Sequence, residues 1–247
     1  MTPPNIQIIV PGDRKTTLQF CADHFMERAQ EAIEDHGFFA VALAGGSTPR
    51  EVYELLALPD YAETIEWDKV QLFWGDERNV PPTDPESNYH MAMKAGFEKL
   101  LVPPFHIHRM VGEKLDAEGY EKTVRKILPD RSFDLVILGV GEDGHTASLF
   151  PDTEALAPSN KLALAYFVPQ KKCWRMSLTL EAINDAENTV FYVLGANKAP
   201  IVKLALTTKP HLPCQLIGTA DHPALWIVDE DGVKLLQHSR SEQLPQA

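Results

Sequence analysis

The sequence lacks several features that mark particular classes of protein. No run of about 18 apolar residues occurs, so no transmembrane helix is expected. The first residues show no basic start followed by an apolar stretch, so no signal peptide is expected. Only three cysteines occur, Cys21, Cys173 and Cys214, an odd number without close spacing. This usage argues against a disulfide framework or a zinc site, and it predicts reduced thiols in a cytoplasmic compartment.

Positive charge is also scarce. The chain has 23 Lys and Arg residues against 35 Asp and Glu residues, a formal net charge of −12 with histidine counted as neutral. The long-range field of such an acidic chain repels phosphates, which argues against nucleic acid or an anionic membrane as a partner. A phosphorylated small molecule therefore needs a local cluster of cations to overcome that field. The composition leaves a monomer and a small homo-oligomer equally open.

The sequence does contain an alternation of strand and helix patterns along its 247 residues, without an internal repeat. Such an alternation is typical of the α/β class, with a mostly parallel sheet and helices on both faces, and here it predicts a single domain over residues 1–247. The expected strands are residues 6–10, 38–44, 70–74, 105–109, 135–138, 162–168, 174–177, 189–194 and 225–229. The expected helices are residues 13–36, 45–58, 87–100, 115–128, 180–185 and 198–206.

Four of the expected strands end in polar turns that contain glycine. These turns are residues 45–49, 75–78, 139–145 and 195–198. The carboxyl ends of parallel strands meet at one edge of a sheet, and open α/β sheets bind their ligands at that edge. We therefore expect the side chains of the four turns to converge on one site. Taken singly, each turn is also typical of an ordinary connection without a ligand.

The first turn has the features of an anion site. Gly45 and Gly46 allow the backbone to approach a ligand closely. Thr48 is expected as the N-cap of the following helix, with Pro49 at the first helical position and Glu51 completing a capping box. The free amides and the positive end of the helix dipole suit a phosphate.

Three cations lie in or near the other turns. Arg78 suits bidentate phosphate binding, and Asp76 beside it can position a substrate hydroxyl or an active-site partner. Asn197 is expected to cap the next helix, which leaves Lys198 in the first turn, where a lysine opposes the helix dipole unless an anion lies close. Arg175, in a later strand, is a weaker candidate. Solvated surface charges are the alternative interpretation of all three.

A histidine follows the strand expected at residues 135–138. The run Gly139-Val-Gly-Glu-Asp-Gly144 is too rich in glycine and acid to continue that strand, and His145 comes directly after it. A neutral imidazole, with a pKa of about 6.5, is the natural general base at neutral pH. Asp143 is one candidate for fixing its tautomer and stabilising the imidazolium. Capping of a short following helix is the structural alternative for His145.

Together these motifs resemble the 6-phosphogluconolactonase family, in order and across nearly the whole chain. The resemblance implies a three-layer α/β/α, Rossmann-like fold that is shared with glucosamine-6-phosphate deaminases. It also implies hydrolysis of 6-phospho-D-glucono-1,5-lactone to 6-phospho-D-gluconate in the oxidative pentose phosphate pathway, with no metal and no cofactor. The matching segments are residues 44–53, 73–78, 87–89, 139–151, 175–179 and 195–198.

Carried over by motif, the resemblance implies that His145 is the catalytic base and that Gly46, Ser47, Arg78 and Lys198 belong to the sugar-phosphate site. One departure is Glu142, where relatives often have a small residue or proline. The complete candidate site consists of His145 and Asp143 as catalytic residues and, for the substrate, Gly45, Gly46, Ser47, Thr48, Asp76, Arg78, Gly144, Arg175 and Lys198.

The deaminase branch is the main alternative to the lactonase. It shares the Asp-Gly-His core and resembles this chain at Asp76 and Glu77, but it carries a glutamate five residues after the histidine that completes a ring-opening relay. Here that position is Phe150. Ring opening needs more acid–base groups than lactone hydrolysis, so the missing carboxylate favours the lactonase. A non-catalytic sugar-phosphate sensor is a third hypothesis, which a turnover assay separates from the other two.

Overall fold

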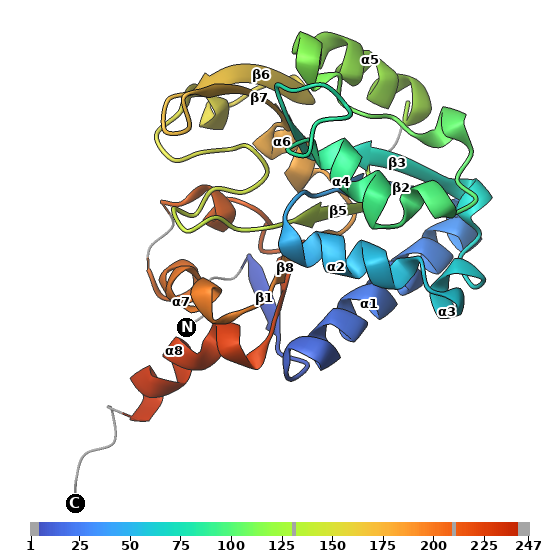
Figure 1. The fold of residues 1–247 in the computed structure, drawn as a ribbon. Helices are drawn as coiled ribbons and strands as arrows, with labels where there is room; N and C mark the ends of the chain where they lie inside the picture. Colours follow the sequence, from blue (N-terminus) through green and yellow to red (C-terminus); the bar gives the residue numbers. More distant parts are fainter. Residues whose placement is uncertain (1–4, 130–131, 209–210, 242–247) are drawn as a thin grey trace, which may run out of the picture.

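A parallel sheet forms the centre of the protein, whose computed structural model describes residues 5–129, 132–208 and 211–241. Its six strands follow the order β1-β9-β8-β5-β2-β3, and every neighbouring pair is parallel (Figure 1). The mostly parallel sheet is thus confirmed. The strands are β1 (Ile6–Ile9), β2 (Phe39–Leu43), β3 (Val70–Trp74), β5 (Leu135–Leu138), β8 (Thr189–Val193) and β9 (Ala224–Val228).

The middle strands of this sheet are buried on both faces. Every residue of β2 and of β5 is buried, and both strands are unbroken apolar runs. Such runs are typical of parallel strands covered by helices on each side. This is why these strands could be located closely from the sequence.

Helices cover both faces of the sheet. On one face, α1 (Arg14–His36) and α2 (Ser47–Leu56) pack side by side (Figure 1). The connections that contain α5 (Ala117–Ile127), α6 (Leu180–Asn184) and α7 (Ala199–Thr207) run the other way across the sheet, so right-handed crossovers put these helices on the opposite face. The result is the expected three-layer arrangement. No helix in the described part of the chain is both long and apolar enough to cross a membrane.

The chain changes direction across the sheet between β2 and β5. From β2 it continues to β3 on one side, and from β5 it continues to β8 on the other. Because β2 and β5 are neighbours, their carboxyl ends diverge into connections that leave a crevice between them. The turns after β2 and β5, which carry the glycines and His145, begin at this crevice.

A second, smaller sheet lies beside the first. It is antiparallel in the order β4-β7-β6, formed by β4 (Asp76–Arg78), β6 (Ala163–Val168) and β7 (Cys173–Leu178). Strands β6 and β7 were expected, but residues 76–78 were expected as part of a turn, and that prediction is wrong. Three consecutive charged residues show no strand pattern, and only their pairing with β7 makes them a strand.

Other predicted elements also differ from the structure. The strand expected at residues 105–109 is wrong, because Pro104–His106 forms a 3-10 helix and only the bridge between Leu72 and Ile107 joins the sheet. Two prolines precede this bridge and cannot donate to a ladder. The helix expected at 87–100 ends earlier, as α4 (Asn88–Ala95). Two α-helices of the described residues were not expected, α3 (Pro59–Ala62) and α8 (Glu230–Ser241).

Candidate active site

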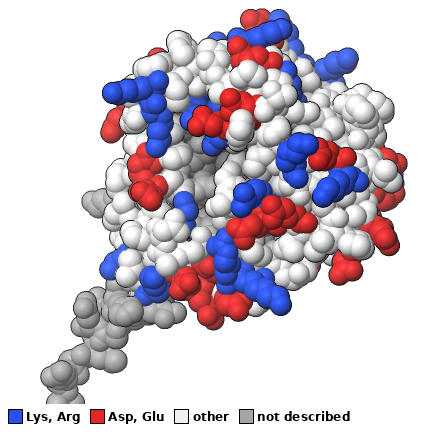
Figure 2. Space-filling view, in the orientation of Figure 1, with Lys and Arg blue, Asp and Glu red and all other residues white. Residues whose placement is uncertain are grey.

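A cleft of about 410 Å³ opens at the crevice between β2 and β5. Its walls come from the turns after β8, β5, β2 and β3, which are adjacent strands in the sheet. Figure 2 shows the hollow in this face of the molecule, with Lys and Arg side chains along its border. The four turns therefore converge, as their position after parallel strands predicted. The predicted site residues that line the cleft are Gly45, Gly46, Ser47, Thr48, Asp76, Arg78, His145, Arg175 and Lys198.

His145 is held by its neighbour Asp143. The Nδ1 atom of His145 lies 2.5 Å from Oδ1 of Asp143, which also accepts the backbone N–H of His145 at 3.2 Å. Partial burial opposes ionisation of Asp143, but the hydrogen bonds from His145 outweigh it and hold the pKa of the carboxyl below its usual value. With the Nδ1 proton directed at Asp143, the neutral imidazole carries its free lone pair on Nε2. The residues directly after His145 form turns and a bridge rather than a helix, so the capping alternative is wrong.

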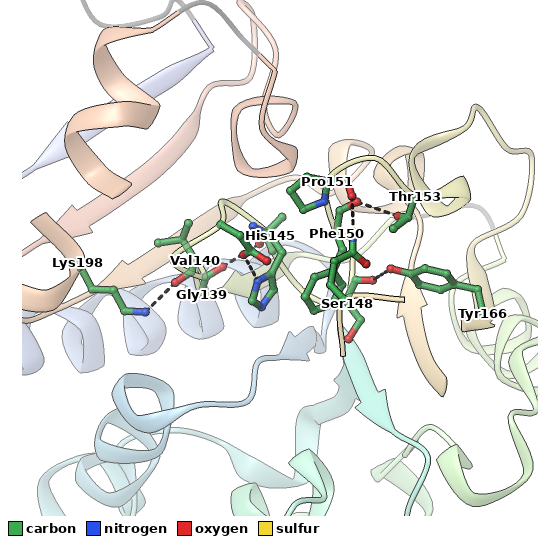
Figure 3. Close-up of polar contacts among 12 residues, drawn as sticks. Gly139, Val140, His145, Ser148, Phe150, Pro151, Thr153, Tyr166 and Lys198 are labelled. Atoms are coloured by element: carbon green, nitrogen blue, oxygen red, sulfur yellow. Dashed lines mark hydrogen bonds and ion pairs between the residues drawn. The ribbon is translucent and has the colours of Figure 1, made fainter. Parts of the chain in front are cut away.

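Phe150 packs flat against His145 (Figure 3). The two ring centroids lie 4.2 Å apart with an angle of 18° between the planes, and Phe150 is almost fully buried. This stacking restrains the plane of the imidazole, and the hydrogen bond to Asp143 restrains the position of its Nδ1 atom. The position that would carry the second carboxylate of a deaminase is therefore occupied by an apolar ring in direct contact with the histidine.

The turn after His145 is tightly restrained. Ala147 has a φ of 46°, a left-handed conformation that costs a residue with a side chain about 1–2 kcal/mol. Three hydrogen bonds hold the next residue, Ser148. Its Oγ donates to Asp76 and its N–H donates to Ser177. Its carbonyl accepts from the Tyr166 hydroxyl, as Figure 3 shows. These buried bonds stabilise the strained turn and so set the position of His145.

Asp76 is committed to contacts within the protein. Its Oδ2 accepts from Ser148 at 2.7 Å and its Oδ1 accepts from Nδ2 of Asn88 at 2.8 Å, in a side chain that is only 8% exposed. Of the two roles expected for Asp76, this arrangement favours positioning an active-site partner over holding a substrate hydroxyl. Asn88 also explains one glycine, because a Cβ at Gly45 would lie 1.9 Å from its Oδ1.

Glu77 serves the fold rather than the cleft. Its buried carboxylate accepts hydrogen bonds from the backbone N–H groups of Arg78, Asn88 and Tyr89 and from the hydroxyl of Ser87, at 2.8–2.9 Å. Burial raises the pKa of Glu77, and the four donors oppose that rise. The carboxylate therefore caps the start of α4, where amides lack helical partners. Sequence reasoning missed this cap because Glu77 lies eleven residues before the first residue of the helix.

Two arginines face each other at the edge of the cleft. Arg78 of β4 and Arg175 of β7 are direct cross-strand partners, and both line the cleft. Like charges in such positions destabilise a sheet unless an anion lies between them. Among the described residues, neither arginine forms an ion pair with a carboxylate, nor do Lys171 and Lys198, which also line the cleft. This concentration of cations without ion pairs lies in a protein whose net charge is negative.

Lys198 reaches the glycine-rich turn that precedes His145 (Figure 3). Its Nζ donates to the carbonyl of Val140 at 2.8 Å. Burial lowers the pKa of Lys198, and the charge of Glu142 partly offsets this. Lys198 is itself the N-cap of α7, without a side-chain cap bond, so the prediction that Asn197 caps this helix is wrong.

The helix after β2 starts without a side-chain cap. Gly46 is the N-cap of α2, with a φ of 101°, and the helix begins at Ser47. The capping box predicted from Thr48 and Glu51 is therefore wrong, and Glu51 instead pairs with Arg14 at 2.5 Å. A φ of this value needs glycine, so the cap position has no side chain to satisfy the first amides. Ser47 and Thr48 line the cleft at this helix start, where an anion can accept from the first amides.

Gly144 and Asp143 are not among the residues that line the cleft. Gly144 has a φ of 81°, its N–H donates to Gly141 and its carbonyl accepts from Cys214. A Cβ on Gly144 would lie 2.9 Å from Leu212, so the glycine permits the close packing beneath the His145 turn. The structure thus shows Gly144 in a backbone role and Asp143 in contact with His145.

Several cleft residues were not predicted from the sequence. Phe150 and Ser148 lie inside the motif that contains His145, so their place in that motif was an available signal. Lys171 lies in the turn between β6 and β7, where the only signal was its charge. Among the described residues, no group of three His, Cys, Asp or Glu side chains is placed to hold a metal ion.

Comparison with known proteins identifies the family. The model of the family described as glucosamine-6-phosphate isomerases/6-phosphogluconolactonase matches residues 12–226. The chain belongs to this family. A curated 6-phosphogluconolactonase from Chlamydia pneumoniae is 37% identical over 219 residues, which cover 87% of this chain and 84% of the relative. One from Haemophilus influenzae is 37% identical over 202 residues, 79% of this chain and 87% of the relative.

A solved structure agrees with these relatives. The crystal structure of 6-phosphogluconolactonase from Thermotoga maritima is 27% identical, with a TM-score of 0.76, and the match covers 91% of this chain and 99% of that one. The resemblance inferred from the motifs is therefore confirmed. With such relatives over most of its length, the chain is an enzyme of the lactonase branch, a carboxylic ester hydrolase.

Proposed function

We propose that the protein hydrolyses 6-phospho-D-glucono-1,5-lactone to 6-phospho-D-gluconate, the second step of the oxidative pentose phosphate pathway, with His145 as the general base. One observation carries the assignment of His145: its imidazole, bonded through Nδ1 to Asp143, lines the same cleft as Arg78, Arg175 and Lys198. The relatives named 6-phosphogluconolactonase support the choice of substrate.

The first task of the site is to orient the lactone. In our proposal, the phosphate is held by Arg78, Lys198 and the amides at the start of α2. These groups form a local positive site for a dianion in a protein whose net charge is negative. Arg175, the cross-strand partner of Arg78, adds a further positive charge to the phosphate site. Fixing the phosphate at one end of the sugar presents the C1 carbonyl to His145.

The second task is proton transfer. Nε2 of His145 removes a proton from water as the water oxygen bonds to C1, and a tetrahedral oxyanion forms. Backbone N–H groups of a glycine-rich turn stabilise that oxyanion. The bond from C1 to the ring oxygen then breaks, and the imidazolium returns its proton to the leaving oxygen. Asp143 stabilises the imidazolium and keeps Nε2 directed into the cleft.

Phe150 argues against deamination. A ring-opening relay needs a second acid–base group beside the histidine, and here a phenyl ring is stacked on the imidazole instead. A non-catalytic sensor would need the anion-binding turns but no oriented base. The hydrogen bond between Asp143 and His145 therefore favours an enzyme.

A parallel assay tests the proposed function. The purified protein is supplied with 6-phosphogluconolactone and, separately, with glucosamine 6-phosphate. We expect acid release from the lactone above its spontaneous rate and no ammonia from the amino sugar. Ammonia release would select the deaminase, and binding of both compounds without turnover would select the sensor.

We also propose the setting of the reaction. Residues 1–247 act as one domain, because the central sheet and both helical layers share a single core. Three unpaired cysteines fit the reducing cytoplasm, and the partner is the small-molecule lactone rather than a nucleic acid. The protein works as a monomer or a small homo-oligomer.

A further inference from the structure

The hairpin formed by β6 and β7 brings a lysine to the cleft. Residues 169–172 connect the two strands, and within this turn Lys171 lines the cleft while its neighbour Lys172 does not. The N–H of Lys171 donates to Val168 at 3.2 Å, and Lys172 has a left-handed φ of 51°. In this tight turn, only the first of the two adjacent lysines is directed to the cleft.

The tip of this hairpin is attached to the segment that follows His145. Nε2 of Gln170 donates to the carbonyl of Pro151 at 2.8 Å, and Nζ of Lys171 lies 5.8 Å from the centre of the Phe150 ring. Phe150 in turn is stacked on His145. Lys171 is therefore held beside the catalytic segment, although its side chain stays accessible to solvent.

The same hairpin also brings an arginine to the cleft. Arg175 of β7 lines the cleft directly opposite Arg78, and Lys171 precedes it by four residues on the same side of the hairpin. None of these three cations forms an ion pair with a carboxylate in the described part of the chain. Three neighbouring cations without counter-charges suit an anion that carries two negative charges.

We propose that Lys171 binds the phosphate of the substrate together with Arg78 and Arg175, and so increases the preference of the enzyme for phosphorylated over unphosphorylated lactones. This inference rests on the proposed function. Lys171 reaches the phosphate from the hairpin side of the cleft, whereas Lys198 is bonded to the carbonyl of Val140 in the turn before His145. Its contact with Phe150 holds the ammonium at the cleft before the substrate enters.

The adjacent lysine provides a matched control. Lys171→Ala and Lys172→Ala remove the same charge from the same turn, and only the first removes a cleft residue. With 6-phosphogluconolactone, we expect Lys171→Ala to raise KM about tenfold with kcat little changed, as for the loss of one charged hydrogen bond. Lys172→Ala is expected to match the wild type. With unphosphorylated glucono-1,5-lactone, both variants are expected to match the wild type.

A binding measurement separates failure of this inference from failure of the proposed function. Calorimetric titration with 6-phosphogluconate needs no turnover, and Lys171→Ala is expected to bind it about tenfold more weakly than Lys172→Ala does. Lys171→Arg is expected to restore most of the affinity. Equal affinities of the two alanine variants would overturn the role of Lys171, as would an equal loss with both lactones or a loss confined to kcat. An inactive wild type would instead contradict the proposed function.

Discussion

Oγ of Ser148 donates a hydrogen bond to Oδ2 of Asp76 across 2.7 Å, and both side chains are buried. Ser148 lies three residues after His145, and Asp76 lies at the start of β4 in the second sheet. The bond therefore ties the turn that carries the imidazole to the strand that carries Arg78. The fold therefore restrains the distance between His145 and Arg78.

This tie predicts coupled effects of mutation. We expect Ser148→Ala and Asp76→Asn each to lower kcat, and the double variant to lose much less than the sum of the two, with a coupling energy of about 0.5–3 kcal/mol. The pH profile of kcat/KM should stay in place, because neither change removes the base. Additive effects in this double-mutant cycle would mean that Asp76 acts directly on the substrate.

The capping role of Glu77 predicts that its substitution lowers the stability of the fold. Its carboxylate accepts four hydrogen bonds at the start of α4, and Glu77→Gln removes one of the two acceptor oxygens. We expect the free energy of unfolding in urea to fall by about 1–3 kcal/mol, the cost of leaving buried donors unpaired. Glu86→Gln, at an exposed position of the same loop, is the control and should be neutral. Equal stabilities of the two variants would contradict the capping role.

Arg78 predicts a loss of affinity that depends on the phosphate. Its removal in Arg78→Ala should weaken binding of 6-phosphogluconolactone by about 1.5–3 kcal/mol, as for a hydrogen bond to a charged group. Steady-state kinetics with unphosphorylated glucono-1,5-lactone provide the comparison, since that substrate offers nothing to the guanidinium. If both lactones lose affinity equally, Arg78 does not bind the phosphate.

Lys198 predicts a dependence of affinity on pH. Only the charged ammonium attracts phosphate, and burial lowers the pKa of Lys198 below that of an ordinary lysine. Affinity for 6-phosphogluconate should therefore be full below that pKa and decline as the pH rises through it. Glu142→Gln removes a charge that raises this pKa, so the decline should move to lower pH.

Calorimetric titrations across the alkaline range measure this decline. In Lys198→Arg the guanidinium stays charged, so the decline should disappear from the range in which the wild type shows it. A wild-type affinity that does not change with alkaline pH, or a Glu142→Gln curve displaced to higher pH, would contradict the role of Lys198.

The convergence of the site could be predicted because it depends on the geometry of parallel strands. Apolar runs such as Leu135–Leu138 located the strands, and the carboxyl ends of neighbouring parallel strands necessarily meet. His145 and Asp143 could be paired because they are two residues apart. The motif around them also identified the family.

What the sequence did not reveal depends on contacts between distant segments. The strand Asp76–Arg78 exists because β7 pairs with it, and nothing in three charged residues signals that partner. Lys171 reaches the cleft through the register of a hairpin. The start of α2 was misplaced because Gly46, with its positive φ, takes the cap position that the capping-box pattern assigned to Thr48.

Turnover of 6-phosphogluconolactone by His145→Ala tests the central assignment most directly. Loss of a general base typically costs about 10²- to 10⁴-fold in rate, which corresponds to roughly 3–5 kcal/mol. The variant should therefore show a kcat lower by that factor, a KM close to that of the wild type, and unchanged affinity for 6-phosphogluconate. A His145→Ala enzyme that keeps the wild-type kcat would contradict the assignment.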